Sequence, residues 1–263
     1  MKENTPKKTI YYTDELNDEF SKAIITPKKI DSSWKYVDDR PFKKFTHFFW
    51  YRIIATPLAW VFLKIKFGHK IIGRELLPKK KKDKRNGFFI YGNHTQDIAD
   101  ALIPSMLCFP KDVYVVVHPN NVSMPFLGRI TPSMGALPLP EDMGGFRNLL
   151  SAIKKRVNDG NALCIYPEAH IWPYYTSIRP FPDDSFGYPV NQKKPVYCFT
   201  NTYQKTKSKV RIVTYIDGPF LPDETKSRAE QKKELRDIVY KTMTERSKNS
   251  NIKVIEYIRR KDK

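Results

Sequence analysis

The stretch "FFIYGNHTQDIAD", from Phe88 to Asp100, decides the fold that we expect for this chain. Its first five residues form an apolar run typical of a buried strand, and polar residues follow directly after Gly92. A helix is predicted next, over residues 97–107. A strand that leads through a short turn into a helix is the repeating unit of α/β domains.

The rest of the chain repeats this alternation. Apolar runs predict further strands at 113–117, 162–166, 196–200 and 210–216, and shorter ones within 66–76 and 134–139. Apolar residues at helical spacing predict helices over 146–157 and 235–242. We therefore expect an α/β fold over residues 66–263, with a mixed, largely parallel sheet flanked by helices.

The charge of the chain is its outstanding compositional feature. Its 263 residues include 47 Lys plus Arg against 28 Asp plus Glu, a formal net charge of +19. A surface this basic attracts polyanions, such as nucleic acid, anionic lipid headgroups or phosphorylated substrates. The lysines are scattered and no nucleic-acid-binding motif is visible, so a specific nucleic-acid partner is the less favoured alternative. The three cysteines lie in apolar contexts without metal-site spacing and indicate reduced core thiols.

Two segments precede the α/β domain. Residues 1–40 are a polar N-terminal arm, with a short helix expected near 14–24. Residues 41–65 are apolar and aromatic, but their longest charge-free run, 53–63, is about half of the roughly 20 residues that span a bilayer. With flanking lysines, they suit a helix lying in the interface of an anionic membrane; the alternative is a helical hairpin buried on the domain. Since no signal-peptide pattern begins the chain, we expect a peripheral or monotopic protein on the cytoplasmic face of the cell membrane.

His94 is the candidate catalytic residue. It follows a predicted strand, and ligands of α/β sheets gather at the carboxyl ends of strands. An imidazole acts as a general base near neutral pH when an acceptor holds its second nitrogen. Asp97 would cap the predicted helix, while Asp100 in its first turn could reach back, so we prefer Asp100 and keep Asp97 open. An acidic residue that only suits the helix dipole is the structural alternative.

Four blocks of the sequence together resemble the glycerolipid acyltransferase family, typified by bacterial lysophosphatidic acid acyltransferases. The family carries Asn-His, four residues and then Asp; here Asn93-His94 is followed by Asp100, one residue later. The other three blocks follow in the family order: "MPFLGRITPSMGALPLPED" (124–142), "LCIYPEAHI" (163–171) and "KPVYCFTNT" (194–202).

The chain departs from the family at the positions expected to bind a phosphate. The arginine that usually follows the apolar run of the second block is missing. In the third block, Ala169, His170 and Ile171 stand where the family has Gly-Thr-Arg. Arg179 is the best local substitute, ahead of Arg129 and Arg147, because a guanidinium donates two hydrogen bonds to a phosphate at once.

The resemblance implies a membrane-associated O-acyltransferase. His94, oriented by Asp100, would deprotonate a hydroxyl of a lysophospholipid or glycerol-phosphate-type acceptor, which attacks the thioester of acyl-CoA or acyl-carrier protein. No metal, cofactor or covalent enzyme intermediate is implied. A divergent, inactive member that only binds lipid is the alternative. The substrate-binding residues that we predict are Asn93, Thr95, Glu168, His170 and Arg179.

Overall fold

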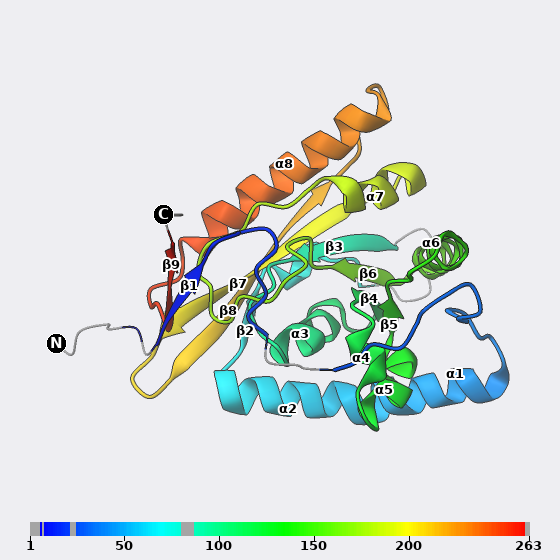
Figure 1. The fold of residues 1–263 in the computed structure, drawn as a ribbon, viewed down its shortest axis with the longest axis horizontal. Helices are drawn as coiled ribbons and strands as arrows, with labels where there is room; N and C mark the ends of the chain where they lie inside the picture. Colours follow the sequence, from blue (N-terminus) through cyan, green and yellow to red (C-terminus); the bar gives the residue numbers. More distant parts are fainter. Residues whose placement is uncertain (1–5, 7, 22–24, 80–86, 261–263) are drawn as a thin grey trace.

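A seven-stranded sheet forms the centre of the protein (Figure 1). The computed structural model describes residues 6, 8–21, 25–79 and 87–260. Within these residues the strand order is β2-β8-β7-β3-β6-β4-β5, and each neighbouring pair is parallel except β7 with β8. The strands are β2 (Lys70–Ile72), β3 (Phe88–Gly92), β4 (Val113–Val117), β5 (Ala136–Pro138), β6 (Ala162–Ile165), β7 (Val196–Lys205) and β8 (Val210–Phe220).

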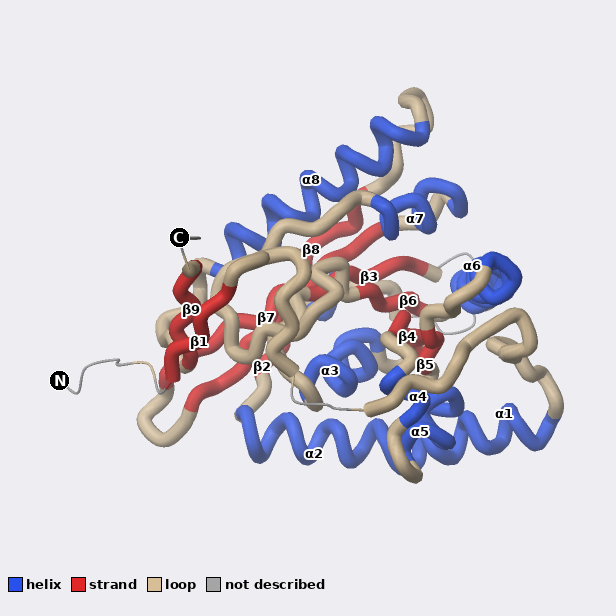
Figure 2. Tube along the Cα trace, viewed as in Figure 1, coloured by secondary structure: helices blue, strands red, loops and turns tan. Residues whose placement is uncertain are grey.

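Helices cover both faces of the sheet, as Figure 2 shows. One face packs against α2 (Thr56–Phe67) and α3 (Ala99–Cys108), and the other against α6 (Met143–Asn158), α7 (Gly187–Gln192) and α8 (Arg228–Ser247). Successive residues of a strand point to opposite faces, so Phe88 and Ile90 enter the first core and Phe89 and Tyr91 the second. Burial on both faces explains why the central strands read as continuous apolar runs. The predicted fold class, a mixed and largely parallel sheet flanked by helices, is confirmed.

Two strands are longer than their apolar runs. The prediction ended one strand at residue 200 and the other at 216, whereas β7 continues to Lys205 and β8 to Phe220. The extension of β7 contains polar residues, which read locally as the end of a strand, but antiparallel pairing with β8 keeps it extended. As a result β7 continues beyond the carboxyl end of β3 and forms a wall beside it.

The N-terminal arm is built into the domain. Strand β1 (Lys8–Tyr12) pairs in parallel with β9 (Ile255–Arg259) as a separate two-stranded sheet that sequence reasoning missed. The helix expected near 14–24 is wrong for residues 14–21, which form turns, while 22–24 lie outside the described residues. The arm then touches three segments at the carboxyl edge of the main sheet, through Phe20 N to Ile171 O at 3.2 Å, Lys28 N to Ser123 Oγ at 2.8 Å and Glu141 N to Ile30 O at 2.8 Å.

One long helix lies along the edge of the molecule (Figure 1). It runs without a break through α1 (Pro41–His47), a π-helical stretch η1 (Phe48–Ala55) and α2, so the segment is not a helical hairpin. Among the described residues it is the one helix long and apolar enough to cross a membrane, yet only 17% of its most apolar stretch is buried. The buried side docks on the domain through Arg52, which pairs with Asp112, and through Tyr51 Oη, which accepts a hydrogen bond from Val113 N at 2.9 Å.

Candidate active site

His94 and Asp100 form a hydrogen-bonded pair at the carboxyl end of β3. The distance from His94 Nδ1 to Asp100 Oδ2 is 2.9 Å. The same carboxylate oxygen accepts hydrogen bonds from the backbone N–H groups of Thr95 and Gln96, at 2.7 and 2.8 Å. An oxygen that already accepts from two N–H groups holds the imidazole as a third donor, so the proton sits on Nδ1 and the Nε2 lone pair remains available.

The extra residue between histidine and aspartate is absorbed ahead of the helix. The prediction that Asp97 caps a helix beginning there is wrong: α3 begins at Ala99, and Ile98, the residue before it, provides no side-chain cap. Asp97 lies on the exposed surface, while Asp100 is 1% exposed in the first helical turn. The side chain of Asp100 reaches back over the preceding turn, as helical side chains do. Of the two aspartates, Asp100 is therefore the one that contacts His94.

The His94 ring is oriented from both sides and open at one end. It stacks on Tyr166, with ring centroids 4.4 Å apart and planes 18° from parallel. Tyr166 in turn donates a hydrogen bond from its hydroxyl to the carbonyl of Asp100. The side chain of His94 is 18% exposed, and Nε2 has no hydrogen-bond partner among the described residues. The arrangement presents a lone pair at the protein surface, which is what a general base requires.

Glu168 supports the backbone of this site from a buried position. Its Oε2 accepts a hydrogen bond from His94 N, and its Oε1 accepts one from Arg179 N, both at 2.9 Å. Its side chain is fully buried. Glu168 thus joins the end of β6 to the end of β3, and its predicted contact with the acceptor stays a prediction.

Arg179 is also buried, and its predicted role as a phosphate ligand stays a prediction. Its guanidinium donates to the backbone carbonyls of Glu15, Glu168 and His170, lies 3.7 Å from a Glu168 carboxylate oxygen and stacks over Trp172. Burial lowers the pKa of Arg179, and the neighbouring Glu168 opposes this shift. Because the side chain is only 1% exposed, it cannot meet a phosphate without leaving these partners.

The three remaining residues predicted to bind substrate have partners of their own. The buried side chain of Asn93 accepts a hydrogen bond from the backbone nitrogen of Asn201 at 2.8 Å and donates one to its carbonyl at 3.1 Å. Thr95 is fully buried and accepts a hydrogen bond from the Tyr203 hydroxyl at 2.8 Å. His170 is half-buried, and its Nδ1 lies 3.2 Å from Glu19 of the N-terminal arm. Asn93 and Thr95 therefore fix the loop that carries His94, and the predicted contacts of these two residues and of His170 with substrate stay predictions.

A chain of buried polar groups behind Asp100 was missed from the sequence. Asn201 Nδ2 donates to Asp100 Oδ1 at 3.2 Å, and Asn201 Oδ1 accepts from the Thr214 hydroxyl at 2.6 Å. Thr214 Oγ1 in turn lies 2.8 Å from His69 Nε2. The available signal was the run Thr200-Asn201-Thr202 directly after the apolar residues 196–199, since buried polar side chains need partners. Both oxygens of Asp100 are thereby fixed.

His69, at the end of this row of buried polar groups, makes the stability of the fold depend on pH. Burial lowers the pKa of His69 from 6.5 to about 4, so between these values the unfolded chain binds a proton that the folded protein does not. We expect the free energy of unfolding to fall by about 3 kcal/mol as the pH drops through this window. Urea denaturation at successive pH values measures it. His69→Gln should remove this part of the slope and the exposed His118→Gln should not; equal slopes for the parent and His69→Gln would contradict the assignment.

Ala169 stands in the third block at a position where the resembling family has a different residue. Ala169 has a φ of 61°, in the left-handed region where glycine is free of strain and other residues are not. The resembling family has glycine at this position. Ala169 thus adopts the backbone conformation that favours glycine, the residue of the resembling family.

The comparison with known proteins agrees with this fold. No family model matches the chain, and no curated protein matches it in sequence. Among solved structures, it is similar to the crystal structure of the 1-acyl-sn-glycerophosphate (LPA) acyltransferase PlsC from Thermotoga maritima, with a TM-score of 0.52 and 18% identity over 77% of this chain and 78% of that one. At this identity the similarity concerns the fold: the chain has the mixed α/β fold of that acyltransferase, with His94 and Asp100 at the carboxyl edge of its sheet.

Proposed function

We propose that this protein is an O-acyltransferase that moves an acyl chain from a thioester to a hydroxyl of a lysophospholipid or glycerol-phosphate-type acceptor. The observation that carries the proposal is the contact of 2.9 Å between His94 Nδ1 and Asp100 Oδ2, in a fold similar to that of an acyltransferase. The open Nε2 of His94 accepts the proton of the acceptor hydroxyl as its oxygen attacks the thioester carbonyl. Asp100 stabilises the imidazolium that forms.

The remaining residues act by holding this pair. Asn201 fixes the oxygen of Asp100 that does not contact His94, and Glu168 fixes the backbone nitrogen of His94. His94 then returns its proton to the thiolate as the tetrahedral intermediate collapses, so that the acyl ester and a free thiol leave. The donor is acyl-CoA or acyl-carrier protein, and the reaction in this form uses no metal, cofactor or covalent enzyme intermediate.

The test is transfer of a labelled acyl chain by the purified protein. Acyl-CoA and acyl-carrier protein are each offered with a panel of lysophospholipids that differ in headgroup, and with glycerol 3-phosphate. The proposal expects a labelled diacyl or monoacyl product with at least one acceptor, and a rate of product formation at least about a hundredfold lower from the His94→Ala variant. Equal product from the parent and the variant would remove His94 from the mechanism.

A second candidate is a lipid-binding protein without acyltransferase activity. It is favoured by the missing arginines of the second and third blocks and by the burial of Arg179, which leaves the family's phosphate ligands without a replacement at these positions. The same assay separates the two: binding of lysophospholipid without any turnover, in parent and His94→Ala alike, would favour this second function.

We also propose that the long helix lies in the interface of the cytoplasmic membrane surface. Leu58 and Trp60 are 63% and 61% exposed, while Tyr51, Leu63 and Phe67 pack on the domain. A helix held to the domain along one side offers its exposed apolar residues to lipid while lying flat. Its basic residues suit anionic headgroups.

Flotation with liposomes tests this placement. Leu58→Glu combined with Trp60→Glu should weaken partitioning at least tenfold, because each buried apolar side chain contributes about 1.5–3 kcal/mol. Both positions are exposed in the folded protein, so the melting temperature should change little. Leu221→Glu is the control, since Leu221 is 68% exposed and lies away from this helix, after β8. Unchanged flotation of the double variant would remove the helix from the membrane contact.

A further inference from the structure

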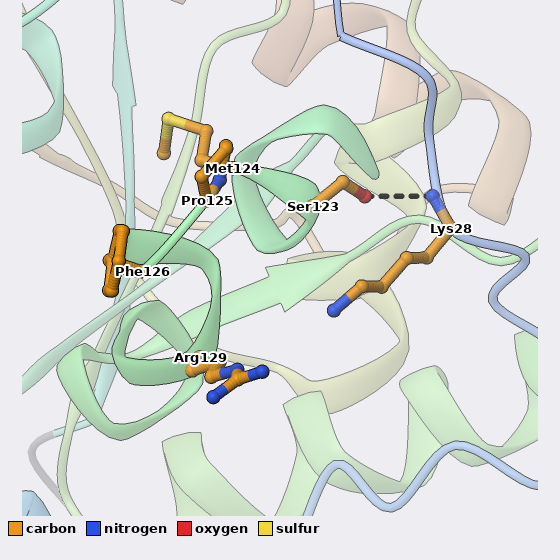
Figure 3. Close-up of a pocket in the computed structure, with 6 residues that line it drawn as sticks. All are labelled: Lys28, Ser123, Met124, Pro125, Phe126 and Arg129. Carbon is orange, nitrogen blue, oxygen red and sulfur yellow. Dashed lines mark hydrogen bonds between the residues drawn. The ribbon is translucent and has the colours of Figure 1, made fainter.

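A hollow of about 300 Å³ lies between the N-terminal arm and the short helices that follow β4 (Figure 3). The helices are α4 (Asn120–Ser123) and α5 (Leu127–Ile130), and the arm is joined to them where Lys28 N donates to Ser123 Oγ at 2.8 Å. The hollow is outside the hydrogen-bonded network around His94. Its lining consists of Lys28, Ser123, Met124, Pro125, Phe126 and Arg129.

Two positive charges face this hollow. Figure 3 shows the ammonium of Lys28 and the guanidinium of Arg129 extending toward the same space from opposite sides. Neither side chain has a carboxylate or other polar partner among the residues that the structure describes. Two unpaired cations that line one hollow are arranged to receive an anion, and a guanidinium beside an ammonium suits a phosphate in particular.

The rim of the hollow consists of exposed apolar side chains, and its backbone is strained at Phe126. Phe126 is 89% exposed, and its φ of 57° is in the left-handed region, which costs a non-glycine residue about 1–3 kcal/mol. Leu127, the next residue, is 53% exposed. A soluble anion would need no such rim. Two large apolar side chains beside a pair of cations match a molecule that carries a phosphate next to hydrocarbon.

The hollow lies on the same side of the molecule as the long helix. The stretch after α5, η4 (Thr131–Met134), packs against this helix, and His47 Nδ1 lies 2.7 Å from Ser133 O. In Figure 1, α5 is drawn across the long helix, and its contact with that helix runs through η4, which packs against both. A surface that receives the exposed residues of the helix would therefore also meet Phe126 and Leu127.

We propose that this hollow is a binding site for the phosphate of an anionic phospholipid in a bilayer. Lys28 and Arg129 hold the phosphate, and Phe126 and Leu127 insert among the acyl chains beside it. The site goes beyond the proposed acyl transfer, since it binds membrane lipid and contributes no group to the reaction. It orients the carboxyl edge of the sheet toward the membrane through a second contact, besides the long helix.

Sedimentation with vesicles tests the charge part of the site. Vesicles of phosphatidylcholine alone and of phosphatidylcholine with phosphatidylglycerol are compared for the parent and for Lys28→Gln/Arg129→Gln. We expect about a 30-fold loss of affinity for the anionic vesicles, from the contribution of two cations at a lipid surface, and little change for phosphatidylcholine. The matched control is Lys233→Gln/Lys241→Gln on α8, which removes the same charge from exposed positions of a helix that packs on the face of the sheet opposite to α2. An equal loss in the control, or no loss in the first variant, would overturn the site.

Phe126→Gly tests the apolar rim separately. Glycine relieves the strained φ, so the melting temperature should hold or rise, while binding to both kinds of vesicle should fall several-fold because the phenyl ring is lost. Unchanged vesicle binding by this variant would overturn insertion of the rim. Inorganic phosphate is titrated in parallel: if it binds the parent through Lys28 and Arg129 while anionic vesicles give no advantage, the hollow takes a soluble anion and the proposal is wrong.

Discussion

Replacing His94 by alanine is expected to lower kcat for acyl transfer by about 10² to 10⁴-fold while leaving the fold intact. The loss follows from the removal of the one open imidazole nitrogen at the carboxyl edge of β3. The fold should survive, because the His94 ring is partly exposed and Asp100 keeps its hydrogen bonds from Thr95, Gln96 and Asn201. Steady-state rates with a saturating acyl thioester and acceptor, together with a thermal melt, measure both quantities.

Two further variants make this result specific. His94→Gln retains an amide that can bond to Asp100 but cannot take up a proton, so its rate should be as low as that of His94→Ala. His118→Ala removes an exposed histidine after β4 and should keep the parent rate. A His94→Ala protein that melts like the parent and transfers acyl chains equally fast would refute general-base catalysis by this residue.

Replacing Asp100 by asparagine is expected to damage both catalysis and stability. The amide removes the charge that stabilises the imidazolium, and we expect a loss of roughly 10³-fold or more in kcat. The Asp100 carboxylate accepts hydrogen bonds from two backbone N–H groups, from the imidazole and from Asn201. The asparagine amide would replace one of these acceptor oxygens by an N–H₂ group, which is a donor. Breaking a buried charged network of this kind costs about 3–5 kcal/mol, measured by urea denaturation.

Asp97→Asn is the matched comparison, since it makes the same chemical change three residues earlier. Asp97 lies at the surface, so its replacement should change kcat by less than about tenfold and stability by about 0.5 kcal/mol or less. The ratio of the two effects is the decisive quantity. A larger loss of activity from Asp97→Asn than from Asp100→Asn would reverse the assignment of the partner of His94.

Much of the fold could be predicted from local sequence, because a strand that is buried on both faces consists of consecutive apolar residues. The runs at 88–92, 113–117 and 162–165 are apolar throughout, and each became a central strand of the predicted kind. The position of His94 followed from the same reasoning, since it comes directly after such a run. The π-helical stretch and the β1–β9 pairing left no comparable signal, because they depend on contacts outside their own segments.

The partners of the site residues were less predictable, and the reason is distance along the chain. Arg179 is a cation close to Glu168 in sequence, and only the structure reveals that its donors point at backbone carbonyls inside the protein. Whether a charged side chain faces a ligand or the core depends on how several loops pack together. Composition and spacing describe each loop alone and do not contain that information.

The sequence by itself determined the α/β class, the strand that ends at Gly92 and the position of His94 six residues before Asp100. These are local properties, set by apolar periodicity and by the reach of a helical side chain. The tertiary structure alone decided that Asp100 is held by Asn201, 101 residues away, and that Asn93 joins the same strand across 108 residues. Such contacts form only when the extension of β7 pairs with β8 and comes to lie beside β3, which no local pattern specifies.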